Sequence, residues 1–162
     1  MRVGVGFDLH RMGADRPLRL GGVEIPGSPG LIGHSDADCV LHAIADALLG
    51  AAALGDIGEH FPDDDPQYRD ADSRDLLART VGIVARAGYG PVNVDCTVLA
   101  EQPRLAPHRE EMRFRLAEIL RIPEDAVGIK FTTLEGLGAL GRGEGIACQA
   151  VCLLEQTGLE EE

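Results

Sequence analysis

The stretch GFDLHR, residues 6–11, places an aspartate and a histidine two positions apart near the start of the chain. In a β-strand, side chains two positions apart point to the same face, about 6–7 Å from each other. Asp8 and His10 would then share one face, close enough to bind one metal ion, while Phe7 and Leu9 occupy the other. The same alternation also fits the solvent-exposed polar face of an amphipathic strand.

A helix farther along the chain offers a third metal ligand. Its buried stripe within residues 38–53 has helical spacing and consists of Leu41, Ile44, Ala45, Leu48 and Ala52. Asp38, His42 and Asp46 recur every four residues and form a second stripe beside it. If this helix packs on the first strand, His42 joins Asp8 and His10 in a two-histidine, one-carboxylate set, the pattern of catalytic zinc. Asp46 or Asp38 is then placed to orient the imidazole of His42. A solvated polar helix face remains the alternative.

Three loops carry further polar groups, although each also fits an ordinary solvated loop. His34 and Ser35 lie in GHSDAD, residues 33–38, where loop amides and a helix N-terminus favour phosphate. The acidic segment 55–66 is suited to binding hydroxyl groups or hard cations. The glycine-rich segment 132–145 contains Arg142 and lets backbone amides approach an anion. It has neither the P-loop spacing nor the context of a dinucleotide-binding loop.

The remaining patterns predict one mixed layer of strands and helices. Strands are expected at residues 2–9, 92–100, 126–133 and 146–154, with a hairpin at 17–26 that turns at Gly21–Gly22. Helices are expected at 73–87 and 107–122, and loops at 27–38 and 55–72. The strand at 146–154 is apolar on both faces, as expected of a central strand or of one buried in an interface. We therefore expect an α+β sandwich, a mixed β-sheet with helices packed on one face.

Composition limits the classes of function. The chain has 162 residues and a formal net charge of −12, which argues against binding nucleic acid or an anionic membrane surface. We expect one domain over residues 1–157 and a disordered tail at 158–162. The N-terminal residues do not contain the apolar segment that is typical of a signal peptide. The four cysteines form no C-x-x-C motif, which indicates reduced thiols in a cytoplasmic protein.

Taken together, several segments resemble one family, the 2-C-methyl-D-erythritol 2,4-cyclodiphosphate synthases. The resemblance is carried by GFDLHR, GHSDADCVLHAIADALLGAAALGDIGEHFPD, ADSRDLL, NVDCTV and GRGEGIACQAV. It implies an enzyme of the non-mevalonate isoprenoid pathway that acts on 4-diphosphocytidyl-2-C-methyl-D-erythritol 2-phosphate. The 2-phosphate of this substrate attacks the β-phosphorus of its own diphosphate and gives the cyclic diphosphate and CMP. The resemblance also implies a homotrimer around a central sheet-lined core, with sites between adjacent subunits.

The resemblance assigns roles to individual residues. Asp8, His10 and His42 would bind one zinc, or another transition divalent ion, per subunit, and Glu135 would bind magnesium or manganese at the diphosphate. His34 and Thr133 would stabilise the transition state. The methylerythritol-phosphate pocket would comprise Ser35, Asp56, Ile57, Gly58, Phe61, Pro62, Asp63, Asp64 and Asp65, and Asp8, His10 and His34 would also contact the substrate. The cytidine side would comprise Ala100, Glu101, Gln102, Pro103, Arg104, Leu105, Ala106, Thr132, Thr133 and Leu134. Arg142 would contact phosphate near the trimer axis, and Ala139 would line the channel on that axis, where the family often has an aromatic residue.

This chemistry needs no nucleophilic side chain, and the chain contains no Ser-His-Asp pattern. Two other functions use the same residues differently. A zinc-dependent phosphohydrolase would activate water with the three ligands and release uncyclised phosphate. A non-catalytic trimeric small-molecule binding protein would not need Asp8, His10 and His42 together.

Overall fold

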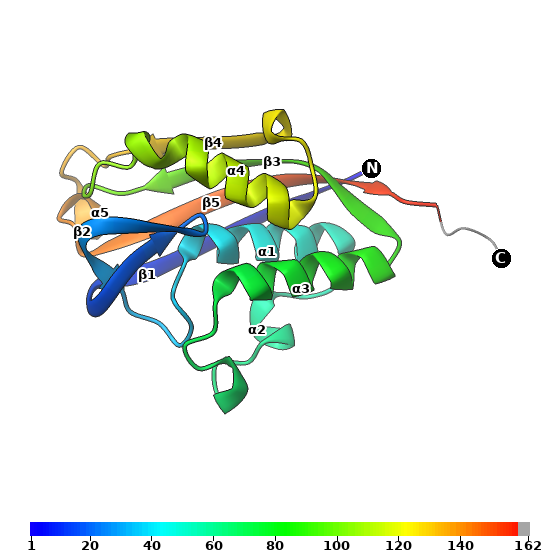
Figure 1. The fold of residues 1–162 in the computed structure, drawn as a ribbon, viewed down its shortest axis with the longest axis horizontal. Helices are drawn as coiled ribbons and strands as arrows, with labels where there is room; N and C mark the ends of the chain where they lie inside the picture. The colour runs from blue at the N-terminus through cyan, green and yellow to red at the C-terminus, as the bar shows by residue number, and fades with distance from the viewer. Residues whose placement is uncertain (159–162) are drawn as a thin grey trace.

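The computed structural model describes residues 1–158 and contains one five-stranded mixed sheet (Figure 1). The strands are β1 (Arg2–Leu20), β2 (Val23–Leu31), β3 (Tyr89–Leu99), β4 (Val127–Thr132) and β5 (Gly145–Gln156), in the spatial order β2-β1-β5-β3-β4. All neighbours are antiparallel except β3 and β4, which are parallel. The predicted α+β fold with a mixed sheet is confirmed, and β5 is the central strand.

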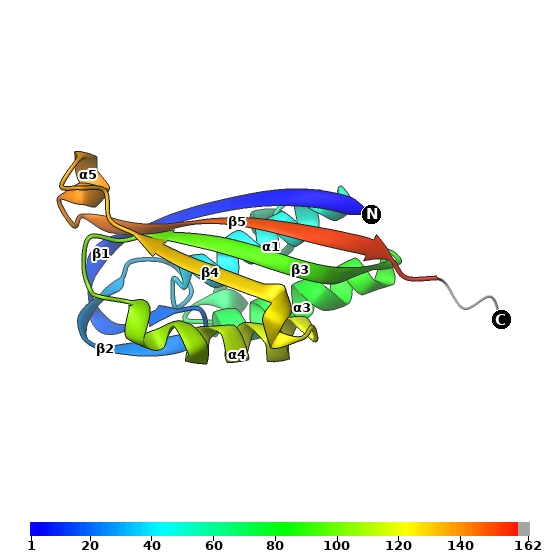
Figure 2. The same ribbon diagram turned by 90° about the horizontal axis from the view of Figure 1, so that it is seen from above.

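The helices are α1 (Cys39–Ala52), α2 (Ile57–His60), α3 (Ser73–Arg86), α4 (Arg109–Leu120) and α5 (Gly138–Gly141). The three long helices cover one face of the sheet, and α5 lies beyond its end (Figure 2). The predicted stripe of α1 is buried in the core. This helix contacts β1 closely because the strand carries glycines where they meet. A Cβ atom at Gly6 would lie 1.9 Å from the carbonyl oxygen of Ala43.

The predicted ends of two strands, β1 and β2, were wrong. β1 continues to Leu20 instead of ending near residue 9, because it changes partners along its length. It pairs with β5 through Arg11 and with β2 from Met12 onward, so its backbone groups keep acceptors and donors. β2 extends to Leu31, so residues 27–31, predicted as loop, belong to this hairpin. The acidic segment also contains the short helix α2 and a 3₁₀ turn, Pro66–Tyr68, which Asp56 and Asp65 cap.

The face of β1 that points away from the helices is apolar and uncovered. Val3, Val5, Phe7 and Leu9 are 67, 58, 56 and 51% exposed, and they alternate with residues that face α1. An apolar surface of this kind is typical of an interaction surface.

Further expectations concern the cysteines and the C-terminal tail. All four cysteines are buried and free, as predicted. Within residues 1–158, no helix has the length and apolar character needed to span a membrane. Most of the predicted tail, residues 159–162, lies outside the described residues.

Candidate active site

Asp8, His10 and His42 converge at one point, as the sequence predicted. Oδ2 of Asp8 lies 2.8 Å from Nε2 of His10 and 3.0 Å from Nδ1 of His42. The two imidazole nitrogens lie 3.3 Å apart. One donor atom from each residue therefore lies within 4.8 Å of the others. One carboxylate oxygen and two imidazole nitrogens suit zinc or a similar divalent ion.

The carboxylate of Asp8 is ionised in this cluster, as a metal ligand must be. Burial by itself would raise the pKa of Asp8, but hydrogen bonds with His10 and His42 outweigh it and hold the pKa well below its usual range. Nδ1 of His10 lies 3.1 Å from the carbonyl oxygen of Ile32, which can only accept a hydrogen bond. Nδ1 of His10 therefore donates to this carbonyl, which leaves Nε2 as the nitrogen that faces the cluster.

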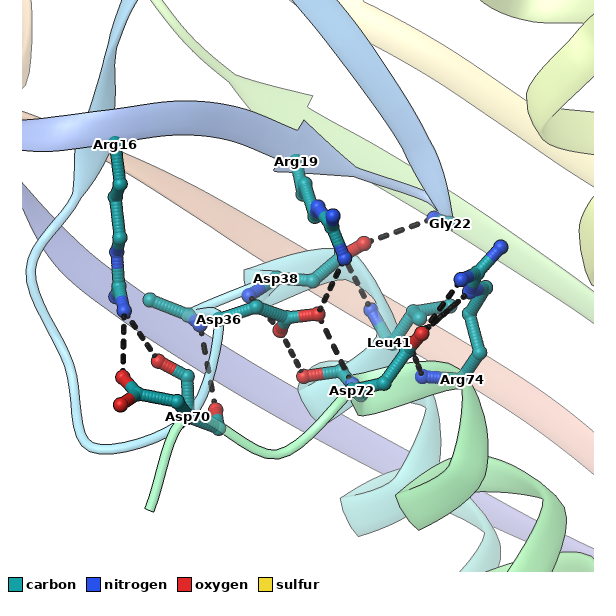
Figure 3. Close-up of polar contacts among 12 residues, drawn as sticks. Arg16, Arg19, Gly22, Asp36, Asp38, Leu41, Asp70, Asp72 and Arg74 are labelled. Atoms are coloured by element: carbon teal, nitrogen blue, oxygen red, sulfur yellow. Dashed lines mark hydrogen bonds and ion pairs between the residues drawn. The ribbon is translucent and has the colours of Figure 1, made fainter. Parts of the chain in front are cut away.

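The sequence expectation for the group that orients His42 was wrong. Neither Asp38 nor Asp46 contacts its ring, because both carboxylates accept backbone N–H groups instead. Asp46 accepts from Ile57 at 2.8 Å. Asp38 caps α1 and accepts from Val40 and Leu41, and it also accepts from Gly21 and Gly22 in the β1–β2 turn (Figure 3).

Hydroxyl groups approach the ring instead. Oγ of Ser73 lies 2.8 Å and Oγ of Ser35 lies 3.2 Å from Nε2 of His42. Sequence reasoning missed Ser73. The available signal was its place at the start of a predicted helix, which reads equally well as a cap.

Arg16 holds the loop that carries His34 and Ser35, and sequence reasoning missed it as well. Its guanidinium donates to the carbonyl oxygen of Leu31 at 2.6 and 2.9 Å and to that of Ser35 at 2.7 Å. Asp70 donates its backbone N–H to the carbonyl of His34 at 2.8 Å and lies beside Arg16 (Figure 3). Hydrogen bonds at Leu31 and at His34 and Ser35 therefore fix this loop where it passes the three candidate ligands.

A first hollow contains the three candidate metal ligands and much of the predicted methylerythritol-phosphate pocket. Its lining residues are Asp8, His10, Gly33, His34, Ser35, His42, Ile57, Gly58, Phe61, Asp63, Tyr68 and Leu76. Nε2 of His34 contacts the carbonyl oxygen of Asp65 at 3.2 Å. Asp56 and Asp65 use their carboxylates to cap local turns, and Pro62 and Asp64 do not line the hollow. Gly33, Tyr68 and Leu76 were not among the predicted residues.

A second hollow gathers the predicted cytidine side except Leu134, together with Phe131. It is lined by Ala100, Glu101, Gln102, Pro103, Arg104, Leu105, Ala106, Phe131, Thr132 and Thr133. The parallel strands β3 and β4 end together here, and the N–H of Ala100 donates to the carbonyl of Thr132. The carboxylate of Glu101 accepts the N–H of Leu134 at 3.0 Å, so the loop after β4 is tied to the loop after β3.

Within one chain the two hollows have no lining residue in common. His34 therefore lies in one and Thr133 in the other. Glu135 is exposed just beyond Thr133, and Arg142 is paired with Glu144 at 3.1 Å. Ala139 lines a third hollow, beside Leu9 and His10.

The chain matches known proteins along nearly its whole length. The model of the YgbB family matches residues 1–155. A relative from Salinibacter ruber, 2-C-methyl-D-erythritol 2,4-cyclodiphosphate synthase, is 59% identical over 155 residues, which are 96% of this chain and 99% of the relative. The chain belongs to this synthase family.

Solved structures of synthases also match the fold of this chain. A structure of 2C-methyl-D-erythritol-2,4-cyclodiphosphate synthase in a CDP-bound form matches with a TM-score of 0.87 and 39% identity, over 95% of this chain and 100% of that one. The bifunctional IspDF from Campylobacter jejuni matches with a TM-score of 0.92 and 41% identity over 96% of this chain, which spans 42% of that longer protein.

Membership of the synthase family confirms the function predicted from the sequence. The chain is an enzyme of non-mevalonate isoprenoid biosynthesis. It is a lyase that converts 4-diphosphocytidyl-2-C-methyl-D-erythritol 2-phosphate to the 2,4-cyclodiphosphate and releases CMP.

Proposed function

We propose that this chain performs the cyclisation by metal-assisted intramolecular phosphoryl transfer, with zinc held by Asp8, His10 and His42. The observation that carries the proposal is the convergence of three donor atoms within 4.8 Å beside a hollow that His34 and Ser35 line. The set combines imidazole and carboxylate donors, leaves room for a further ligand and has a partner for the free nitrogen of each histidine.

The reaction must overcome the repulsion between two anionic phosphate groups of one substrate. Zinc, when bound, supplies Lewis-acid stabilisation of the phosphoryl charge. His34 and Ser35 line the hollow that contains the three ligands, where they can contact the phosphoryl oxygens. Holding the substrate bent, with its 2-phosphate near its β-phosphorus, removes much of the entropic barrier. The substrate supplies its own nucleophile, so the chain needs none.

The nucleotide half of the substrate is assigned to the second hollow. The segment Ala100–Ala106 and the hydroxyl groups of Thr132 and Thr133 would bind the cytidine and its diphosphate. We assign a magnesium or manganese ion to Glu135, whose exposed carboxylate is a hard oxygen ligand. Arg142 would contact phosphate.

We further propose that the two halves meet across a subunit boundary in a homotrimer. Two observations support this arrangement. The two hollows are separate within one chain, although one substrate must contact both. The apolar face of β1, which carries Val3, Val5, Phe7 and Leu9, needs a cover, and a closed trimer around the sheets would provide it. Residues 1–157 would form one synthase domain, and the free thiols fit a cytoplasmic location.

Phosphorus NMR of the products tests the chemistry directly. The proposal predicts the signals of the cyclic diphosphate together with one CMP per turnover, and about one zinc per chain by elemental analysis. In His42→Ala, zinc content and cyclisation should fall together while the trimer persists. Release of uncyclised phosphate would favour the phosphohydrolase, and binding without turnover would favour a non-catalytic protein.

A further inference from the structure

The imidazole of His42 has a second set of contacts on the side that faces away from the proposed metal site. Its Nε2 lies 2.8 Å from Oγ of Ser73, the first residue of α3, and Ser73 is completely buried. Oγ of Ser73 in turn makes a short hydrogen bond to Oδ1 of Asp36. A continuous chain therefore runs from a carboxylate through a hydroxyl to the ring of a proposed metal ligand.

Hydrogen-bond chemistry fixes the direction of this chain. A serine hydroxyl has one proton to donate and two lone pairs to accept with. Because Ser73 donates its proton to Asp36, it can only accept from His42. Nε2 of His42 must then carry a proton, so in the neutral ring the lone pair is on Nδ1, the nitrogen that faces Asp8 and His10.

Asp36 is itself held as an acceptor. Its Oδ2 accepts the backbone N–H of Ser73 at 3.0 Å, and its Oδ1 accepts the backbone N–H of Asp38 at 3.2 Å. The guanidinium of Arg19 lies 4.0 Å from Oδ2 and points at it from β1 (Figure 3). The backbone N–H of Asp36 is bonded to Ala71, which joins the 33–38 loop to the segment before α3. Both carboxylate oxygens therefore face donors, and neither can rotate away without losing one.

We propose that Ser73 and Asp36 are positioning residues that hold His42 in the Nε2–H tautomer and aim its Nδ1 at the metal. This inference rests on the proposed role of His42 as a metal ligand. Outer partners of this kind typically change metal affinity about 10–100-fold when they are removed. Neither residue touches the first hollow, so their loss should act through zinc and leave the substrate contacts in place.

Three variants test the inference. Ser73→Ala removes the nearer acceptor of the ring proton and leaves Ser35, whose Oγ lies 3.2 Å from Nε2. Asp36→Asn places an amide nitrogen against a donor in either orientation, because both oxygens of Asp36 accept N–H groups. Thr80→Val is the matched control, since Thr80 is also completely buried on α3 but its hydroxyl bonds the carbonyl of Leu76 in its own helix.

The readouts are the zinc dissociation constant, by competition with a chromophoric chelator, and the tautomer of His42, by long-range ¹H–¹⁵N NMR of the zinc-loaded protein. We expect zinc to bind about 10–100-fold more weakly to Ser73→Ala and Asp36→Asn and with unchanged affinity to Thr80→Val. In the wild type, Nε2 of His42 should be protonated. The NMR measurement keeps the inference testable even if a variant does not fold.

Two results would overturn the inference: wild-type zinc affinity in folded Ser73→Ala, or an unprotonated Nε2 in the zinc-loaded wild type. His42→Ala separates this failure from that of the proposed function. Loss of zinc in His42→Ala with none in Ser73→Ala rejects only the positioning role. Full zinc content in His42→Ala rejects the metal site itself.

Discussion

Oδ2 of Asp8 lies 3.0 Å from Nδ1 of His42, although 34 residues separate them along the chain. The contact joins a strand to a helix, so it depends on how closely α1 approaches β1. Gly4 and Gly6 set this approach, because a Cβ atom at either would lie 1.9 Å from a carbonyl oxygen of α1. The geometry of the metal cluster and the packing of the core are therefore coupled.

We predict that Gly6→Ala weakens both the fold and zinc binding. Its methyl group must push α1 away from β1, which should lower the free energy of unfolding by about 1–3 kcal/mol or more and move His42 away from Asp8. Urea unfolding and the zinc content of purified protein measure the two effects.

Gly50→Ala on the same helix is the matched control. Nothing lies within 4 Å of a Cβ atom there, and alanine favours helix, so this variant should be up to about 1 kcal/mol more stable and bind zinc normally. Equal stability of Gly6→Ala and the wild type would contradict the tight helix–strand contact.

A second prediction concerns the pH dependence of stability through Asp38. Burial raises the pKa of this carboxyl from 3.8 to about 6, against the backbone N–H groups that favour its charged form. Since the folded state holds the proton more tightly, this contribution to stability is present below about pH 4 and is lost as the pH rises through about 6. Asp38→Asn lacks it. The wild type should therefore lose up to roughly 3 kcal/mol relative to the variant between about pH 4 and 7.

Urea unfolding of the wild type and Asp38→Asn at several pH values, at equal protein concentration, measures this difference. A wild type that instead gains stability over the variant as the pH rises would mean that the four N–H donors outweigh burial, and that Asp38 is charged throughout.

The convergence of the three candidate metal ligands could be predicted from the sequence because local periodicity places them, while the resemblance to the synthases favoured a metal site over a solvated polar face. A strand repeat of two residues places Asp8 and His10 on one face, and a helical repeat places His42 beside the core stripe of α1. The strands at 92–100 and 126–133 and the helix at 73–87 were also found by periodicity, to within a few residues.

The errors came from contacts between segments that lie far apart along the chain. The sequence could not show that the Asp38 carboxylate binds backbone N–H groups rather than His42. Two of its donors, Gly21 and Gly22, lie 17 and 16 residues away in the β1–β2 turn. The contact of Ser73 with His42 depends on the course of residues 55–72 between α1 and α3. This segment has no periodicity from which its course could be predicted. The full length of β1 depends on its exchange of β5 for β2, which a pattern within one strand does not reveal.

A third prediction tests the second metal. Glu135→Gln should keep the fold and the zinc but lose most of the magnesium-dependent activity, because an amide is a weaker ligand for a hard cation than a carboxylate. Turnover is titrated with magnesium in both proteins. Glu111→Gln is the control, since Glu111 is an exposed glutamate on α4 that lines neither hollow. An unchanged magnesium profile in Glu135→Gln would remove this residue from the metal site.

The central claim is that one reaction site is built from the metal half of one subunit and the nucleotide half of its neighbour. The most direct test mixes two inactive variants, His42→Ala in the metal half and Thr133→Ala in the nucleotide half, provided that Thr133→Ala proves inactive. The variants are denatured, mixed equally and refolded, and mixed trimers are verified by native mass spectrometry. Cyclisation is then measured by phosphorus NMR.

In randomly assembled trimers, about one site in four combines an intact metal half with an intact nucleotide half. We predict recovery of about a quarter of the wild-type activity. No recovery in verified mixed trimers would show that each chain carries its own complete site, and the shared site would be wrong.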